Sequence, residues 1–330
     1  MPITINGTSG VTLNSQFDSA SSFGFKNRII NGQMQIAQRA TSATITAGST
    51  IAAGYSTVDR FYVYCTGANV TAAQVAGSGA NRNNLQITGA ASVTAIGVGQ
   101  RIESLNSYDM AGSTATLSVN MSNSLLTSVT WTAYYANTAD TFGTLASPTR
   151  TQIATGGFTI TSTLANYSAQ ISIPAAATTG IEIVFTVGAQ ISGTWVIGNV
   201  QLEKSSIATS YDYRSIGTEL ALCQRYYAKM NANTGVYTAF GSGIFSGTTS
   251  GNMYIKFPTT MRSSPVINQS GCAISDTVAS PAITAVSTTY AGTDSAFQLF
   301  TVASGGTLYR PAVLIANNSA AAYIELTSEI

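Results

Sequence analysis

Residues 113–121, with the sequence STATLSVNM, alternate apolar and polar side chains along the chain. In an extended strand, the alanine, leucine, valine and methionine side chains all point to one side, and the small polar side chains point to the other. Residues 129–135, VTWTAYY, and residues 181–187, IEIVFTV, have the same alternation. A strand with one apolar and one polar face is typical of antiparallel sheets, so the sequence predicts an all-β protein.

Turn-forming clusters such as residues 77–79, GSG, separate the alternating stretches, and short strands spaced in this way predict β-sandwiches. We expect three parts. Residues 1–27 are rich in Gly, Ser, Asn and Thr and predict an extended arm that needs a partner to be ordered. Residues 28–214 predict a first sandwich module, and residues 215–330 predict a second, smaller one.

A helical pattern occurs at residues 218–229, TELALCQRYYAK, and predicts a short helix that links the two modules. Thr218 is a suitable N-cap, and Glu219 follows in the first turn, where the helix dipole favours a carboxylate. An apolar stripe along this helix predicts a packing surface at the junction of modules or subunits. We expect that surface to consist of Leu220, Cys223, Tyr226 and Tyr227, with Cys223 buried and reduced.

The composition is poor in charge. Charged residues make up 8% of the chain, against roughly 25% in typical soluble proteins. Disorder does not account for this, because the chain is 45% hydrophobic and has a net charge of +1. The 14 basic residues are scattered, which argues against nucleic-acid binding. A charge-poor surface suits a protein that buries much of itself against copies of itself.

The three cysteines, Cys65, Cys223 and Cys272, form no CxxC motif and predict buried thiols of a protein made in a reducing cytoplasm. The N-terminal residues MPITINGTSG lack the basic and apolar regions of a signal peptide. No apolar run approaches the roughly 20 residues that span a bilayer. We therefore expect a soluble protein without membrane insertion.

The chain contains no histidine, which removes Ser-His-Asp and Cys-His catalysis and the commonest metal ligand. No P-loop, GxGxxG or calcium-loop motif is present, so we expect neither a cofactor nor a metal. Glycoside hydrolysis needs only two carboxylates, and Asp59, Glu103 and Asp109 are candidates. The structural interpretation is favoured: Asp59 pairs with Arg60 or Arg101, and Glu103 caps a turn. We predict that the protein is not an enzyme.

Tyrosine is abundant, with 16 residues, and its apolar face and polar tip suit sugar stacking and protein interfaces equally. Trp131 and Trp195 lie in alternating stretches and are expected in the core, whereas Tyr134 falls on the face opposite Trp131. The candidate ligand contacts are Tyr134 in the first module and Tyr237, Tyr290 and Tyr309 beside Gly- or Thr-rich loops of the second. Taken singly, Tyr237, Tyr290 and Tyr309 are each more often ordinary tyrosines on a sheet surface.

A series of short motifs follows in order along most of the chain. They are FKNRIING at residues 25–32 with Met34 and Gln38-Arg39, VDRF at residues 58–61, VQLE at residues 200–203 with Ala208-Thr209 and YDYR at residues 211–214, ELALCQRYY at residues 219–227, Phe257-Pro258 with Met261-Arg262 and Pro265, and the terminal Glu329-Ile330. Together they resemble a widespread phage and prophage tail-fibre family. Two positions depart from the family pattern: Phe61 replaces a tryptophan, and Ser210-Tyr211-Asp212 replaces Pro-Phe-Glu. Both changes keep an aromatic residue.

The resemblance implies a jelly-roll or carbohydrate-binding-module-like sandwich followed by a smaller β domain, assembled as a homotrimer on a virion. It further implies that residues 1–27 attach to the phage tail, the baseplate or other virion proteins, and that the chain adsorbs to a host cell-surface glycan. It carries over no catalytic residues. Two alternatives stay open: a structural virion component, such as a head fibre, capsid decoration or baseplate part, and a polysaccharide depolymerase that uses Asp59 or Glu103.

Overall fold

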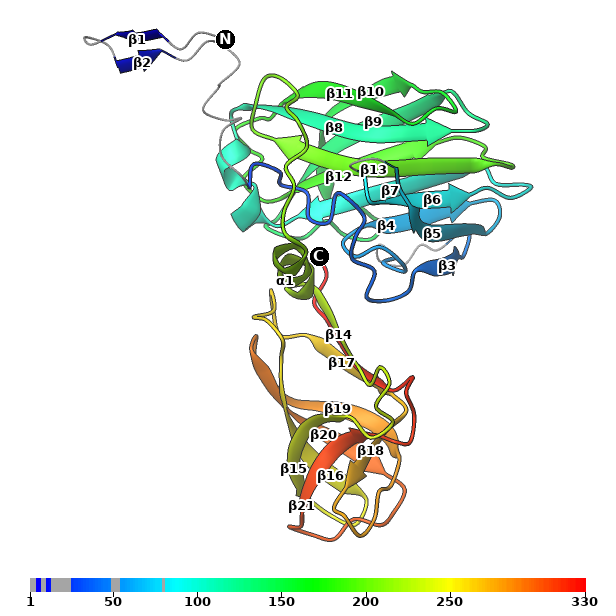
Figure 1. The fold of residues 1–330 in the computed structure, drawn as a ribbon, viewed down its shortest axis with the longest axis vertical. Helices are drawn as coiled ribbons and strands as arrows, with labels where there is room; N and C mark the ends of the chain where they lie inside the picture. Colours follow the sequence, from blue (N-terminus) through cyan, green and yellow to red (C-terminus); the bar gives the residue numbers. More distant parts are fainter. Residues whose placement is uncertain (1–3, 7–9, 13–24, 49–53, 79–80) are drawn as a thin grey trace. The chain divides into compact units, whose positions relative to one another are not determined.

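The computed structural model describes residues 4–6, 10–12, 25–48, 54–78 and 81–330, and these divide into two compact units (Figure 1). Unit 1 comprises Met1–Glu219 together with Ile330, and unit 2 comprises Leu220–Glu329. Both are built almost entirely of antiparallel strands, as the alternating sequence predicts. Within the described ranges, no helix has the length and apolar character needed to cross a membrane.

Unit 1 consists of two antiparallel sheets that enclose one hydrophobic core. The five-stranded sheet has the order β10 (Arg150–Thr159), β9 (Ser128–Ala136), β12 (Ile181–Val187), β7 (Ala95–Ile102) and β4 (Tyr62–Thr66). The six-stranded sheet has the order β11 (Ala165–Ser172), β8 (Thr114–Asn123), β13 (Thr194–Glu203), β6 (Asn83–Thr88), β5 (Val70–Ala76) and β3 (Ser42–Ile45). Two 3-10 turns, η1 (Ser104–Asn106) and η2 (Tyr108–Met110), precede β8.

The alternating stretches form strands with the predicted face in the core. All four apolar side chains of β8, from Ala115 to Met121, are fully buried, and both Trp131 and Trp195 belong to the same core. The opposite face of β8 is less exposed than alternation predicts, because a later segment covers it. Thr116, for example, is buried and its Oγ1 donates to the carbonyl of Ser205 over 2.8 Å.

Unit 2 has a three-stranded and a six-stranded sheet that contribute side chains to a second common core. The smaller sheet has the order β14 (Tyr227–Asn231), β22 (Tyr323–Thr327) and β17 (Val266–Ser270). The larger has the order β18 (Cys272–Ser275), β21 (Pro311–Ala316), β15 (Ala239–Phe245), β16 (Ser250–Lys256), β20 (Ser295–Val302) and β19 (Ile283–Ala291).

Helix α1 (Ile216–Gln224) begins earlier and ends earlier than residues 218–229, the range that the sequence predicts. Ser215, rather than Thr218, lies at its N-terminal end: Ser215 Oγ accepts from the backbone N–H of Thr218, and the Ser215 carbonyl accepts from that of Glu219. The helix ends before Tyr227 because Tyr227 begins β14, where it pairs with Thr327 of β22. A sheet partner from the far end of the chain therefore overrides the local helical pattern.

In the predicted N-terminal arm, residues 1–27, β1 (Thr4–Asn6) and β2 (Gly10–Thr12) pair as an antiparallel hairpin. Residues 25–27 are described as part of unit 1, and the remainder of the arm lies outside the described residues. The predicted role of this arm in attachment therefore stays a prediction.

Candidate functional site

The outer side of the five-stranded sheet, facing away from the core, carries tyrosine and threonine side chains in register. One row across β4, β7, β12, β9 and β10 consists of Tyr64, Gly97, Thr186, Thr130 and Gly157, and the next consists of Tyr62, Gly99, Val184, Thr132 and Thr155. We call these ten residues the tyrosine–threonine face. Its hydroxyls interact across strands, since Thr132 Oγ1 and Thr155 Oγ1 share a hydrogen bond of 3.0 Å.

Two glycines on β7 allow the tyrosine rings to lie flat against the sheet. A Cβ atom at Gly97 would lie within 3.0 Å of the Tyr64 ring, and one at Gly99 within 3.0 Å of the Tyr62 ring, so no larger residue fits beneath either ring in this position. The two rings are stacked side by side, with an interplanar angle of 23°. Tyr62 is fully buried, whereas Tyr64 is half-buried and presents part of its ring outward. Tyr64 thus forms an aromatic platform.

A buried ion network lies directly beside this platform. Glu182 is completely buried and accepts hydrogen bonds from Arg101 Nε over 2.8 Å and from Tyr62 Oη over 2.7 Å. Its other carboxylate oxygen pairs with Arg150. Burial, together with the adjacent Glu182 carboxylate, raises the pKa of Tyr62 well above its ordinary value, so the phenol remains a donor at neutral pH.

The same network fixes Tyr134, because the Arg150 guanidinium carbon lies 4.0 Å from the centre of the Tyr134 ring. The charged groups at this end of the sheet are therefore engaged with one another. On the other side of the same sheet surface, Thr130 of β9 and Thr155 and Gly157 of β10 are exposed, with β7 and β12 between them and Tyr64. A sheet surface that carries exposed hydroxyls and a flat aromatic ring is chemically suited to a polyhydroxylated ligand.

The structure separates the four predicted ligand tyrosines. Tyr134 lies beside the tyrosine–threonine face, opposite Trp131 as expected, but Arg150 covers part of its ring. The other three, Tyr237, Tyr290 and Tyr309, are all more than half exposed and belong to unit 2. Their role in ligand binding stays a prediction.

Tyr62 and Tyr64 are not among the site residues that the sequence predicts. A signal for them exists in two separate stretches: tyrosines alternate in YVYCT at Tyr62–Thr66, and glycines alternate in AIGVGQRI at Ala95–Ile102. Only the pairing of β4 with β7 brings each ring over its glycine. That register cannot be obtained from either stretch alone.

The candidate catalytic carboxylate Asp59 is fully buried and structurally engaged. Its Oδ1 accepts from the backbone N–H of Gln38 over 3.0 Å and lies 3.9 Å from Arg39 Nη1. Of the two arginines expected to pair with it, Arg101 binds Glu182, so that pairing is wrong. Arg60 donates to the Arg101 carbonyl over 2.6 Å, and its pairing with Asp59 stays a prediction. Asp59 holds the segment that contains Gln38 and Arg39.

The other two candidate carboxylates are also placed in structural surroundings. Glu103 is buried and immediately precedes η1, where its backbone carbonyl, not its carboxylate, accepts from Asn106 N over 2.9 Å. Asp109 pairs with Arg28 over 2.8 Å. Among the described residues, no group of three or more acidic, cysteine or histidine side chains is arranged to hold a metal ion.

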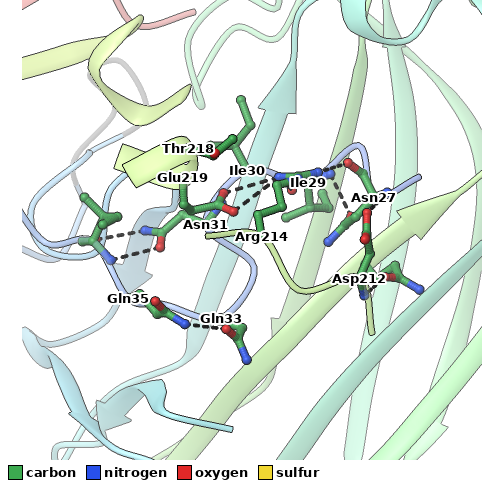
Figure 2. Close-up of polar contacts among 12 residues, drawn as sticks. Asn27, Ile29, Ile30, Asn31, Gln33, Gln35, Asp212, Arg214, Thr218 and Glu219 are labelled. Carbon is green, nitrogen blue, oxygen red and sulfur yellow. Dashed lines mark hydrogen bonds and ion pairs between the residues drawn. The ribbon is translucent and has the colours of Figure 1, made fainter. Parts of the chain in front are cut away.

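Figure 2 shows a second polar network, which links residues 27–31 to residues 212–219. Asn31 has a positive φ of 60°, and its side chain donates to the carbonyls of Ile36 and Asp59 and accepts from the N–H of Ile36, over 2.8–3.0 Å. The backbone N–H of Asn31 donates to Glu219 at the start of α1. Gly32 follows without a side chain, because a Cβ there would clash with the Val200 carbonyl.

Arg214 completes this network. Its Nη1 donates to the Ile29 carbonyl over 3.1 Å and pairs with Glu219 over 3.3 Å, and its Nη2 donates to the Asn27 carbonyl. Asn27 in turn donates through Nδ2 to the Val200 carbonyl over 3.0 Å. We call Asn27, Asn31, Arg214 and Glu219 the clasp. Residues from three motifs of the tail-fibre resemblance therefore meet in one structural network. Their hydrogen bonds within the chain explain these residue types, and no ligand is needed to explain them.

The four residues expected at the module junction all belong to unit 2. Cys223, Tyr226 and Tyr227 are buried and Leu220 is half-buried, so the expected burial of Cys223 is confirmed. Ser328 N donates to the Tyr226 carbonyl over 2.8 Å, and Tyr227 Oη donates to Glu325 over 3.0 Å. Their role as a junction surface stays a prediction.

No protein-family model matches the chain, and no curated protein matches it. Several solved structures are similar to about half of it. A CBM4 carbohydrate-binding module shares 12% identity and a TM-score of 0.34, covering 53% of this chain and 98% of the module. The module TmCBM61, solved with β-1,4-galactotriose, shares 10% identity and a TM-score of 0.33, covering 54% and 99%. The enzymatically active domain of bacteriophage CBA120 tailspike protein 4 shares 16% identity and a TM-score of 0.32, covering 54% of this chain and 21% of that one.

Proposed function

We propose that this protein is a glycan-binding attachment protein without enzymatic activity, and that the tyrosine–threonine face of unit 1 contacts the glycan. The observation that carries the proposal is the Tyr64 ring, held flat over Gly97 in a row that continues across the sheet through Thr186 to the exposed Thr130. A ring in this position can stack on the apolar face of a sugar while threonine hydroxyls exchange hydrogen bonds with sugar hydroxyls. The ionic groups nearby are already paired, so the face favours an uncharged, polyhydroxylated ligand.

We further propose that the chain is a phage tail-fibre subunit that adsorbs the virion to the host bacterial surface. The ordered series of motifs supports this proposal, and so does the charge-poor composition. Three copies in a homotrimer, attached to the virion through residues 1–27, would present three such faces. Repetition raises the overall affinity of weak individual sites without any new contact.

The test is binding of the full chain to an array of bacterial surface polysaccharides, with Tyr64→Ala compared with the wild type. We expect binding of at least one polysaccharide and a loss of about tenfold in Tyr64→Ala, which corresponds to one aromatic contact. Tyr108→Ala, an exposed tyrosine of η2 away from the face, serves as the matched control and should bind like the wild type.

Two other results would replace the proposal. If the assembled chain bound no polysaccharide, a structural role in the virion would be favoured. If new reducing ends appeared during incubation, the protein would be a depolymerase, and Asp59→Asn and Glu103→Gln would show which carboxylate is required.

A further inference from the structure

The outer side of the six-stranded sheet of unit 2 carries a continuous row of directly opposed residues. From β18 to β19 the row consists of Ser275, Val313, Ser242, Tyr254, Phe297 and Tyr290. Strand alternation explains its direction: in β16, Met253 and Ile255 are buried in the core, so Tyr254 between them must point outward. Tyr254 and Phe297 remain 47% and 38% exposed.

A groove of about 600 Å³ lies over part of this row. Its lining includes Ser242 and Ile244 of β15, Val313 of β21 and Phe297 of β20. The last residue of β18, Ser275, and Thr277 in the turn that follows also line it. A volume of roughly 300–1,000 Å³ with mainly apolar walls and a few polar groups is characteristic of small-molecule sites. This volume can accommodate a ligand of a few sugar units.

Asp276 is the charged residue that lines this groove, and its charge is satisfied within the wall. Its Oδ1 accepts from the backbone N–H groups of Val278 and Ala279 over 3.0 and 2.8 Å, and its Oδ2 pairs with Arg310 over 3.2 Å. These bonds lower the pKa of Asp276, so the carboxylate is ionised at neutral pH. The Asp276 carboxylate disfavours an anionic ligand, and among the described residues the groove lining contains no lysine or arginine that could bind one.

We propose that this groove is a second glycan site, separate from the face on unit 1, which takes a short neutral oligosaccharide. Sugar rings stack on Phe297 and the adjacent Tyr254, and Ser242 and Ser275 exchange hydrogen bonds with sugar hydroxyls. The row continues past the groove to Tyr290, which gives a longer chain a further contact. This second site rests on the proposed function and extends it to a second surface. Loss of glycan binding at one site need not affect binding at the other.

The test uses the full chain and calorimetric titration with neutral trisaccharides of glucose, galactose and mannose. The Tyr64→Ala background weakens the face on unit 1, so binding that is then lost with Tyr254 and Phe297 belongs to the second site. Adding Tyr254→Ala and Phe297→Ala should weaken that binding by about tenfold or more, since both stacking contacts are lost. Val266→Ala, an exposed residue of β17 outside the groove lining, should leave it unchanged. Thermal unfolding of each variant establishes that it is folded.

Four results would overturn the inference. One is a wild-type chain that binds none of the three trisaccharides. Another is a Tyr64→Ala chain that binds none of them, which would leave the proposed function intact with a single site. A third is preference for uronic-acid trisaccharides over neutral ones. The last concerns the chain that carries Tyr254→Ala and Phe297→Ala. If its assembly sedimented differently while sugar binding was unchanged, the row would be a contact between subunits.

Discussion

Arg101 and Glu182 face each other across β7 and β12, and Arg101 Nε donates to Glu182 Oε1 over 2.8 Å. Both side chains are buried, although they lie on the outer side of the five-stranded sheet. Unit 1 therefore has a polar cluster outside its hydrophobic core, made of this pair with Arg150 and Tyr62. A buried cluster of this kind is costly to break because the remaining charges lose their partner.

Glu182→Gln is expected to destabilise unit 1 by about 3 kcal/mol, because it leaves Arg101 and Arg150 without a carboxylate. Denaturant unfolding followed by tryptophan fluorescence measures this directly, since both tryptophans, Trp131 and Trp195, are in the core of unit 1. Glu325→Gln in unit 2 is the control and should not move the transition. A loss below about 1 kcal/mol in Glu182→Gln would show that the pair contributes no more than a surface ion pair.

Gly97→Ala tests the platform without removing the tyrosine. The added methyl group would occupy the space of the Tyr64 ring, so the ring must lift from the sheet. We expect polysaccharide binding to fall by about tenfold while unit 1 stays folded, because the ring is the end of a flexible side chain. Gly188→Ala is the matched control, since a Cβ at Gly188 meets no atom within 4 Å. Equal binding by the two variants would contradict the role of the platform.

Asn31 combines a positive φ with three buried side-chain hydrogen bonds, and two substitutions separate these contributions. Asn31→Gly keeps the backbone conformation and loses the hydrogen bonds, at an expected cost of about 3 kcal/mol. Asn31→Ala also strains the backbone and should be about 1 kcal/mol worse. Tryptophan-detected unfolding compares the two variants. An alanine variant as stable as the glycine variant would mean that the left-handed conformation is not maintained.

Cys272 should make unit 2 sensitive to alkaline pH. Burial raises the pKa of this thiol from 9.0 to about 11, so the folded state favours the neutral thiol. The resulting stabilisation is fully present below pH 9 and is lost as the pH rises through about 11. The melting temperature of unit 2 in the wild type should therefore fall relative to Cys272→Ala between pH 9 and 11. Parallel melting temperatures across this range, measured by calorimetry, would contradict the shifted pKa.

Local pattern was sufficient for the strands and their core faces. The stretches at residues 113–121, 129–135 and 181–187 form β8, β9 and β12, because a period of two is a property of the backbone itself. The local pattern did not predict which residues cover the outer faces of the sheets. The burial of Glu182 depends on arginines from two other strands, and the clasp joins residues almost two hundred positions apart.

The site was harder to predict for two physical reasons. The platform needs a register between strands, which decides that Tyr64 meets Gly97. The outward row on unit 2 could not be predicted from the sequence, because β20, SAFQLFTV, has aromatic residues on both faces. The buried Gln298, whose Nε2 donates to the Ser287 carbonyl, stands where alternation expects an apolar residue. Phe297 therefore could not be distinguished from a core residue by pattern alone.

The division between the two units falls between Glu219 and Leu220, inside helix α1 rather than in a loop. Glu219 carries the last side chain of the clasp, and after it only Ile330 belongs to unit 1. This position is therefore suitable for joining the chain to a segment of another protein. A chimaera that retains the chain up to Glu219 and continues with a different C-terminal unit keeps every hydrogen bond of the clasp, provided that the new segment continues the helix. Helix α1 would then be the element at which one C-terminal unit is exchanged for another.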